Sequence, residues 1–207
     1  MHSRVPSRLP AFVASALAIL GMAVPALPAA GAEPPFEIVF PQEWEATDFR
    51  STFGDGRSGG RAHKGNDLMA PRMTEVYAAA DGVVIHVGTN RLSGRNLRIQ
   101  HEEAWTTHYV HLNNDNPGTD DGAAPWSLTV APGIEVGTEV EAGQLIAWVG
   151  DSGNAEWTAS HTHFELRRNG TAINPYQLLR DAFEVSRERD MWLESQIIPD
   201  PPDYGTE

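Results

Sequence analysis

The feature that most constrains the fold is a succession of short β-branched and aromatic segments, which begins near Val76 and is interrupted by turns such as Asp81-Gly82. No helical period separates these segments, and short strands at regular spacing are typical of antiparallel β domains rather than of alternating strands and helices. Strands are expected at 83–87, 96–101, 105–112, 139–140, 144–149 and 161–167. We therefore predict a mainly β chain, built as an antiparallel sheet or sandwich.

One short helix is expected near the end of the chain. It begins near Pro175 and carries four apolar residues at helical spacing: Leu178, Leu179, Ala182 and Phe183. After Asp190 the chain becomes acidic and rich in proline. Such composition favours mobility, so we expect a folded domain over 33–187 and a mobile tail over 188–207.

The first residues have the pattern of a secretory signal peptide. Arg4 and Arg8 precede an apolar stretch over 11–24, and Ala30-Gly31-Ala32 offers small residues for cleavage. An uncleaved membrane anchor is the alternative, but prolines interrupt the stretch, which is shorter than the ~20 residues that a span requires. We expect a signal peptide over 1–32, cleavage near Ala32, and a secreted protein, extracellular or periplasmic, without a stable membrane anchor.

Composition narrows the function. The sequence has no cysteine, which excludes disulfides, thiolate metal sites and a cysteine nucleophile. It carries 28 acidic and 15 basic residues, for a formal net charge of −13. Nucleic-acid binding depends on clustered Lys and Arg, so no nucleic-acid partner is expected. We expect the protein to be a monomer.

Histidines occur in three patterned segments, each ambiguous by itself. His63 and Asp67 lie four residues apart in a glycine-containing loop, a spacing that also arises by chance. In the strand over 161–167, alternation directs His161, His163 and Glu165 to one face. Two imidazoles about 7 Å apart along a strand can serve one site, although a solvated polar face is the alternative interpretation.

The third segment, 105–112, contains two histidines. Alternation puts His108 and His111 on opposite faces, so only one of them is expected to face a site, and the period leaves open which one. Together the patterned histidines and Asp67 form a thiol-free donor set. A hydrolytic zinc ion needs three such protein ligands, and further imidazoles are suited to acid-base catalysis at neutral pH. His86 and His101 are interpreted as structural.

Five ordered segments resemble the lysostaphin and LytM-type zinc metallopeptidases, a family of cell-wall endopeptidases with a duplicated hybrid motif. They are His-x-Gly-x-Asp at 63–67, Val-x-Ala-x-x-x-Gly-x-Val at 76–84, Tyr-x-His-Leu at 109–112, a glycine-bounded hairpin at 137–150, and His-x-His-Phe-Glu at 161–165. The similarity spans about 49–179. It implies a LytM-like fold for the chain.

The resemblance also implies roles for individual residues. His63, Asp67 and His163 match the ligands of one zinc ion per chain, while His111 and His161 match two catalytic histidines, which makes His108 a bystander. Glu165 and Tyr109 are expected to orient a site imidazole or to line the substrate groove.

The implied function is that of a secreted zinc endopeptidase, which uses zinc-activated water to cleave peptide bonds in peptidoglycan stem peptides or cross-bridges. One alternative is a non-catalytic member that regulates wall hydrolases or scaffolds an envelope assembly; no ligand is missing, which disfavours it. Another is a zinc peptidase acting on secreted proteins or on a rival's wall. The segment 113–131 is longer than the usual connection, and the sequence leaves open whether it walls the groove or covers the site.

Overall fold

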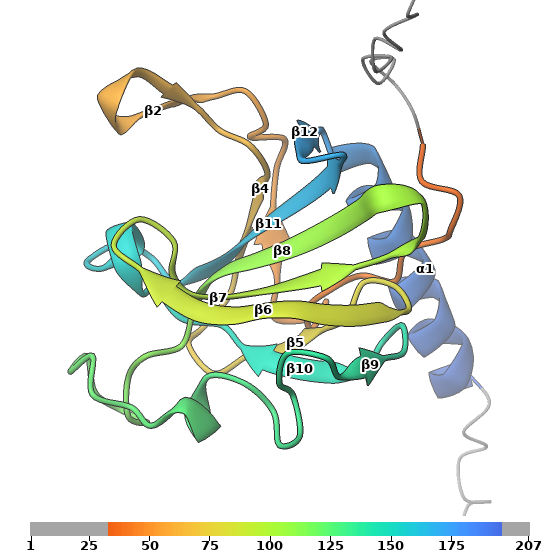
Figure 1. Ribbon diagram of the computed structural model, residues 1–207. Coiled ribbons are helices and arrows are strands. Elements are labelled where there is room, and N and C mark those ends of the chain that lie inside the picture. The colour runs from red at the N-terminus through yellow and green to blue at the C-terminus, as the bar shows by residue number, and fades with distance from the viewer. Residues whose placement is uncertain (1–32, 196–207) are drawn as a thin grey trace, which may run out of the picture.

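The computed structural model describes residues 33–195 (Figure 1). The expected signal peptide, 1–32, and the last residues of the expected tail, 196–207, lie outside this range. Within 33–195, no helix is both long and apolar enough to cross a bilayer.

The fold is dominated by an eight-stranded antiparallel sheet (Figure 1). Along the sheet the strands follow the order β1, β4, β11, β8, β7, β6, β9, and β12 pairs with β11. Their bounds are β1 (Asp48–Phe49), β4 (Asn66–Met69), β11 (His161–Arg168), β8 (Trp105–Leu112), β7 (Gly94–Gln100), β6 (Gly82–Asn90), β9 (Glu139–Val140) and β12 (Thr171–Ile173). The expected mainly β, antiparallel architecture is therefore confirmed.

Two small sheets complete the β structure. Strand β5 (Glu75–Tyr77) pairs with β10 (Leu145–Trp148), and β2 (Gly56–Arg57) pairs with β3 (Arg61–Ala62). The β2–β3 hairpin projects away from the body of the large sheet, beyond β4 (Figure 1). Four short 3-10 turns connect strands: η1 (Ser58–Gly60), η2 (Glu102–Ala104), η3 (Trp126–Leu128) and η4 (Gly153–Ala155).

The core lies between the large sheet and the β5–β10 pair. Its fully buried side chains come from both layers and include Trp105, Tyr109, Phe164, Leu68, Leu97, Val76 and Ile146. Burying a side chain of this size contributes about 1.5–3 kcal/mol relative to exposure. The strands that carry the candidate site therefore pack on one continuous hydrophobic core.

Helix α1 (Tyr176–Ser195) packs against the segment that enters the first strand. Leu179 and Ala182 are buried, and the ring of Phe183 contacts those of Phe40 and Trp44. Near its end, Trp44 Nε1 donates a hydrogen bond to Asp190 Oδ2 over 2.6 Å. The helix begins where expected but is longer, and residues 188–195 of the expected tail are helical because this contact and the Phe183 cluster anchor them.

Candidate metal centre and active site

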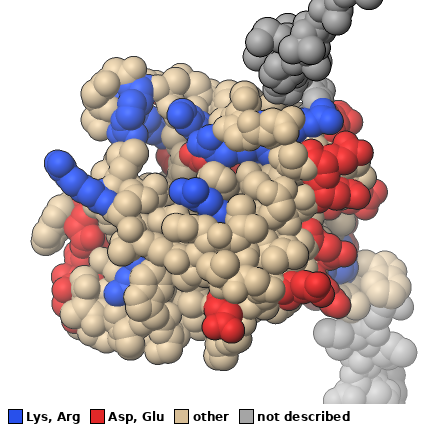
Figure 2. All heavy atoms as spheres, in the orientation of Figure 1, with Lys and Arg blue, Asp and Glu red and all other residues tan. Residues whose placement is uncertain are grey.

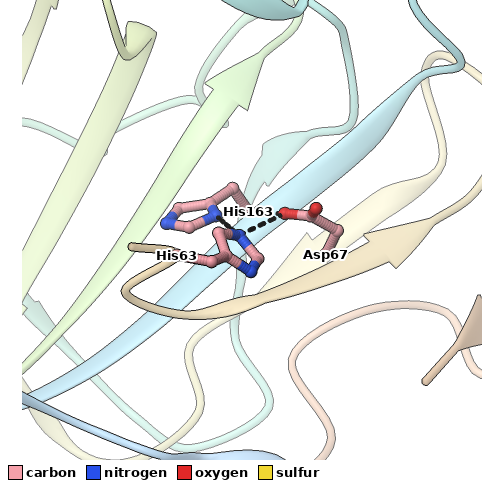
Figure 3. Close-up of side chains that lie close together, drawn as sticks. All are labelled: His63, Asp67 and His163. Carbon is pink, nitrogen blue, oxygen red and sulfur yellow. Dashed lines mark hydrogen bonds and ion pairs between the residues drawn. The ribbon is translucent and has the colours of Figure 1, made fainter. Parts of the chain in front are cut away.

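The central residues come from two neighbouring strands and the loop before them (Figure 3). Strands β4 and β11 are paired so that Asp67 lies directly opposite His163. His63 precedes β4 in a loop that lies against β11 at Gly65. A Cβ atom at this glycine would lie 2.1 Å from the Phe164 carbonyl oxygen, so only glycine permits the approach. This explains why the chain has glycine between His63 and Asp67.

The three side chains converge at one point. His63 Nε2 lies 2.7 Å from His163 Nδ1, and each of these nitrogens lies 3.0 Å from Asp67 Oδ1 (Figure 3). A tetrahedral zinc ion with bonds of 2.0–2.2 Å holds its ligand atoms about 3.3 Å apart. The observed spacings of 2.7 and 3.0 Å are somewhat shorter than that value, so the side chains need only a small outward movement to hold the ion.

Each imidazole has a second ring nitrogen, which faces away from the point of convergence, and the hydrogen bonds of these outer nitrogens decide where the protons lie. His63 Nδ1 donates to the Thr52 carbonyl oxygen over 2.8 Å, and His163 Nε2 donates to Glu165 Oε1 over 3.0 Å. In neutral imidazoles the inner nitrogens therefore carry lone pairs, and both face the Asp67 carboxylate. Three lone pairs without a proton among them form a site for a cation, so the donor set fits zinc.

The pKa shifts of His163 and Asp67 also indicate that positive charge is favoured at this point. Burial lowers the pKa of His163, but the protonated ring donates hydrogen bonds to both Asp67 and Glu165, and these outweigh burial and raise the pKa. Burial likewise disfavours the charged form of Asp67, yet hydrogen bonds with His163 and His63 hold the pKa of this carboxyl well below its usual range. One added positive charge is thus stabilised at this point of the molecule.

Glu165 supports the centre from the same face of β11. Its carboxylate accepts hydrogen bonds from His163 Nε2 and, over 2.6 Å, from Arg167 Nε, and it lies 3.3 Å from His108 Nδ1. Burial raises the pKa of Glu165, but these hydrogen bonds keep it well below its ordinary value. An ionised carboxylate at this position orients the His163 ring.

Two further imidazoles lie beside the centre. The rings of His111 and His161 are 5.0 Å apart, and His161 Nε2 is 3.8 Å from Asp67 Oδ1. Each ring donates its Nδ1 proton to a backbone carbonyl oxygen, His161 to Ala159 over 2.8 Å and His111 to Ser152 over 2.7 Å. The free basic nitrogen of both rings is therefore Nε2.

His111 is held in its neutral form. Burial and, to a smaller extent, the neighbouring His161 lower its pKa to about 3, and the hydrogen bond to Ser152 opposes the shift only in part. The residue also has a left-handed backbone, with a φ of 64°. This conformation ends the alternation of β8, and as a result His108, Val110 and His111 all line the same groove. The expectation that only one of the two histidines faces the site is wrong for this reason.

Tyr109 does not reach the groove, and the expectation that it contributes there is wrong. Its side chain is fully buried on the core face of β8, where alternation directs it. The hydroxyl oxygen accepts a hydrogen bond from the Ala79 backbone N–H over 2.8 Å. Tyr109 therefore joins the large sheet to the segment after β5 and acts in packing.

The centre opens into a groove of about 730 Å³. Although the sequence is acidic overall, most charged side chains that line the groove are basic: Arg57, Arg61, Lys64, Arg98 and Arg167, against Asp67 and Glu165. Figure 2 shows Lys and Arg gathered around the end of the molecule that carries β2, with a group of acidic side chains on the side of α1. Sequence reasoning missed this lining. The signal in the sequence was the alternation of β11, which continues from Glu165 to Arg167 and places both side chains on the same face.

The β2–β3 hairpin, and not the long connection, supplies one wall of the groove. Arg57 Nη2 contacts Asp67 Oδ2 over 2.6 Å, which leaves Oδ1 for the histidines. No residue of 113–131 is among those that line the groove. The segment therefore forms no part of the groove lining; instead it is hydrogen-bonded to β10, through Asn113 and Thr129 to Trp148.

A family model and several known proteins match this chain. The family model for peptidase family M23 matches residues 61–122 and 127–175. Peptidoglycan DD-endopeptidase ShyC from Vibrio cholerae is 31% identical over 115 residues, which are 56% of this chain and 22% of that protein. The chain spans less than half the length of the curated relatives that it matches.

Two solved structures share the fold. A zinc-containing peptidase from Vibrio cholerae has a TM-score of 0.53 and 26% identity, over 67% of this chain and 39% of the other. The catalytic domain of lysostaphin from Staphylococcus simulans has a TM-score of 0.51 and 25% identity, over 65% of this chain and 92% of the other. Since the family model covers more than half of the sequence and the fold agrees, the chain belongs to peptidase family M23.

Proposed function

We propose that this chain is a secreted, zinc-dependent endopeptidase that hydrolyses peptide bonds in peptidoglycan stem peptides or cross-bridges. The observation that carries the proposal is the convergence of His63, Asp67 and His163 on one point, with two further imidazoles beside it. Relatives named as peptidoglycan endopeptidases support the substrate. The complete set of ligands and histidines disfavours a purely regulatory or scaffolding role.

In this proposal the metal is bound by Nε2 of His63, Oδ1 of Asp67 and Nδ1 of His163. When bound, zinc supplies Lewis acidity, which polarises a peptide carbonyl and makes water acidic enough to ionise near neutral pH. Arg57 and Glu165 hold the ligand side chains in place from the outer side. Their hydrogen bonds fix which atom of each ligand faces the ion.

His161 is the residue best suited to accept the proton of the attacking water. Its Nε2 carries the lone pair and lies beside Asp67, whereas its Nδ1 proton is engaged by the Ala159 carbonyl. His111 is neutral at physiological pH, and its Nε2 is a hydrogen-bond acceptor that orients the same water. After attack, a protonated His161 delivers the proton to the leaving amine.

The basic lining of the groove favours peptides that carry free carboxylates. A cation and a carboxylate 4 Å apart attract each other by about 1 kcal/mol in water, and by about 4 kcal/mol at a partly desolvated surface. Side chains such as Arg61 and Lys64 line the open part of the groove, where they can meet such a substrate. An acidic protein thereby presents a basic binding surface to an anionic polymer.

The test is the set of peptides released from peptidoglycan, measured by mass spectrometry. We expect new amino termini with the wild-type protein and none with His161→Ala, which keeps all three zinc ligands. His86→Ala is the matched control, because His86 lies on β6 outside the groove. Zinc-saturated wild-type protein that releases nothing from several peptidoglycan types would overturn the proposal.

A further inference from the structure

A second group of charged side chains lies where the long segment 113–131 meets the turn after β10. Four carboxylates form this acidic cluster: Asp115, Asp120, Asp151 and Glu156. One oxygen from each of Asp115, Asp120 and Glu156 lies within 4.8 Å of the other two. The proposed mechanism uses none of these residues.

Arg72 forms ion pairs within the acidic cluster, but it neutralises only part of the negative charge. Its Nη2 lies 2.5 Å from Asp151 Oδ2 and 2.9 Å from Asp120 Oδ1, while its Nε lies 3.5 Å from Asp115 Oδ2. Arg95 also interacts electrostatically with Asp115, so two guanidinium groups oppose four carboxylates and the cluster keeps a net negative charge. Burial raises the pKa of Glu156, and the charges of Asp151, Asp115 and Asp120 add to the shift.

Several buried oxygens of this region have no hydrogen-bond donor among residues 33–195. Asp151 is fully buried, and its Oδ1 accepts no hydrogen bond. Asp115 is 1% exposed, and its Oδ2 has only the 3.5 Å contact with Arg72. Asn114 Oδ1 is buried without a donor as well. A buried acceptor without a partner costs about 1–3 kcal/mol, so three at one place indicate a missing partner.

We propose that the acidic cluster binds one Ca²⁺ ion. The oxygens that lie together come from Asp115, Asp120 and Glu156. The adjoining Asn114 and Asp151 each add a buried oxygen that accepts no hydrogen bond. Calcium takes 6–8 oxygen ligands at about 2.3–2.6 Å, so its ligand atoms lie at most about 5 Å apart, and one oxygen each of Asp115, Asp120 and Glu156 meets this limit. Magnesium requires a smaller octahedral site, and zinc prefers the nitrogen donors of the histidine centre.

The ion would join two segments beside the groove. Asp151 precedes Ser152, whose carbonyl oxygen accepts the Nδ1 proton of His111 and whose Oγ donates to the Leu112 carbonyl over 2.6 Å. The same turn lines the groove through Asn154 and Ala155. Bound calcium would therefore link the segment 113–131 to the turn after β10, which holds His111 through Ser152. The ion has a structural role and does not take part in the chemistry.

The test measures calcium binding to the purified protein, first saturated with zinc so that the histidine centre is filled. Calorimetry with CaCl2 is expected to give one site with a Kd of about 10⁻⁴–10⁻³ M, the range of extracellular calcium modules. At 10 mM CaCl2 and a Kd of ~1 mM, the unfolding equilibrium constant falls about 10-fold, which thermal unfolding detects as a higher Tm. Neither readout depends on peptidase activity.

Variants decide whether the acidic cluster is responsible. The double substitution Asp120→Asn, Glu156→Gln changes two side chains at the accessible edge of the cluster, and it is expected to abolish both the heat of binding and the rise in Tm. Glu135→Gln, an exposed acid elsewhere, is the matched control and should behave as wild type. Absence of binding at 10 mM CaCl2, equal stabilisation of the double variant, or equal stabilisation by MgCl2 would overturn the proposal.

Discussion

Replacing Gly65 by alanine is expected to displace the loop that carries His63. The added Cβ would lie 2.1 Å from the Phe164 carbonyl oxygen and 2.9 Å from its carbon, both backbone atoms of a central strand. Ordinary contacts between such atoms exceed about 3 Å, so the loop must retreat by roughly 1 Å. Because β11 is held on both sides by β4 and β8, the loop moves and the strand stays.

Two effects follow from this displacement. Overpacking of this kind costs about 1–3 kcal/mol, which corresponds to a fall in Tm of about 2–4 °C for each kcal/mol in a chain of this size. His63 Nε2 also moves relative to His163 Nδ1, now 2.7 Å away, so we expect zinc affinity to fall about 10–100-fold.

The assay combines thermal unfolding of the metal-free protein with a competitive zinc titration against a chromophoric chelator. Gly56→Ala is the matched control, since a Cβ there meets nothing within 4 Å. Wild-type zinc affinity in Gly65→Ala would refute the argument that close packing of this glycine positions His63.

Three further predictions concern the core, the pH dependence and the groove. Tyr109→Phe leaves the Ala79 N–H without its acceptor and should lower stability by about 1–3 kcal/mol in denaturant unfolding, with kcat unchanged. Burial lowers the pKa of His101 in the folded protein, so the unfolded chain binds a proton more readily and the wild-type Tm falls as pH drops below about 6.5. His101→Gln should make the Tm less dependent on pH in this range. An unchanged dependence would contradict the prediction. Arg61→Gln with Lys64→Gln should raise KM for a peptide with free carboxylates; an equal rise for its amidated form would contradict the charge argument.

Much of the fold could be predicted from residue periodicity. The longer strands β6, β7, β8 and β11 were expected within a few residues of their observed ends, because alternation over seven or more residues is a clear pattern. Two short strands, β9 and β10, were also expected, whereas β1 and β4 were not, because two to four residues are too few to show a period. They form because neighbouring strands offer hydrogen bonds and apolar contacts, which only the folded chain provides.

The site was predictable in its residue types and less so in its surroundings. The motif segments contain the histidines and Asp67, but the left-handed backbone of His111 breaks the period from which only one of His108 and His111 was expected to face the site. The basic lining combines side chains from the β2–β3 hairpin, β7 and β11, and strand register alone brings them together. Local sequence carries no such information.

The decisive experiment is a zinc titration of the chelated, metal-free protein, with peptide release from peptidoglycan as the readout. The proposed mechanism predicts no release without metal and a linear gain that stops at one zinc ion per chain. His63→Ala should remain inactive at the same zinc concentration. Full activity in the metal-free protein, or saturation of the histidine centre without any peptide release, would contradict the claim that this centre performs hydrolysis.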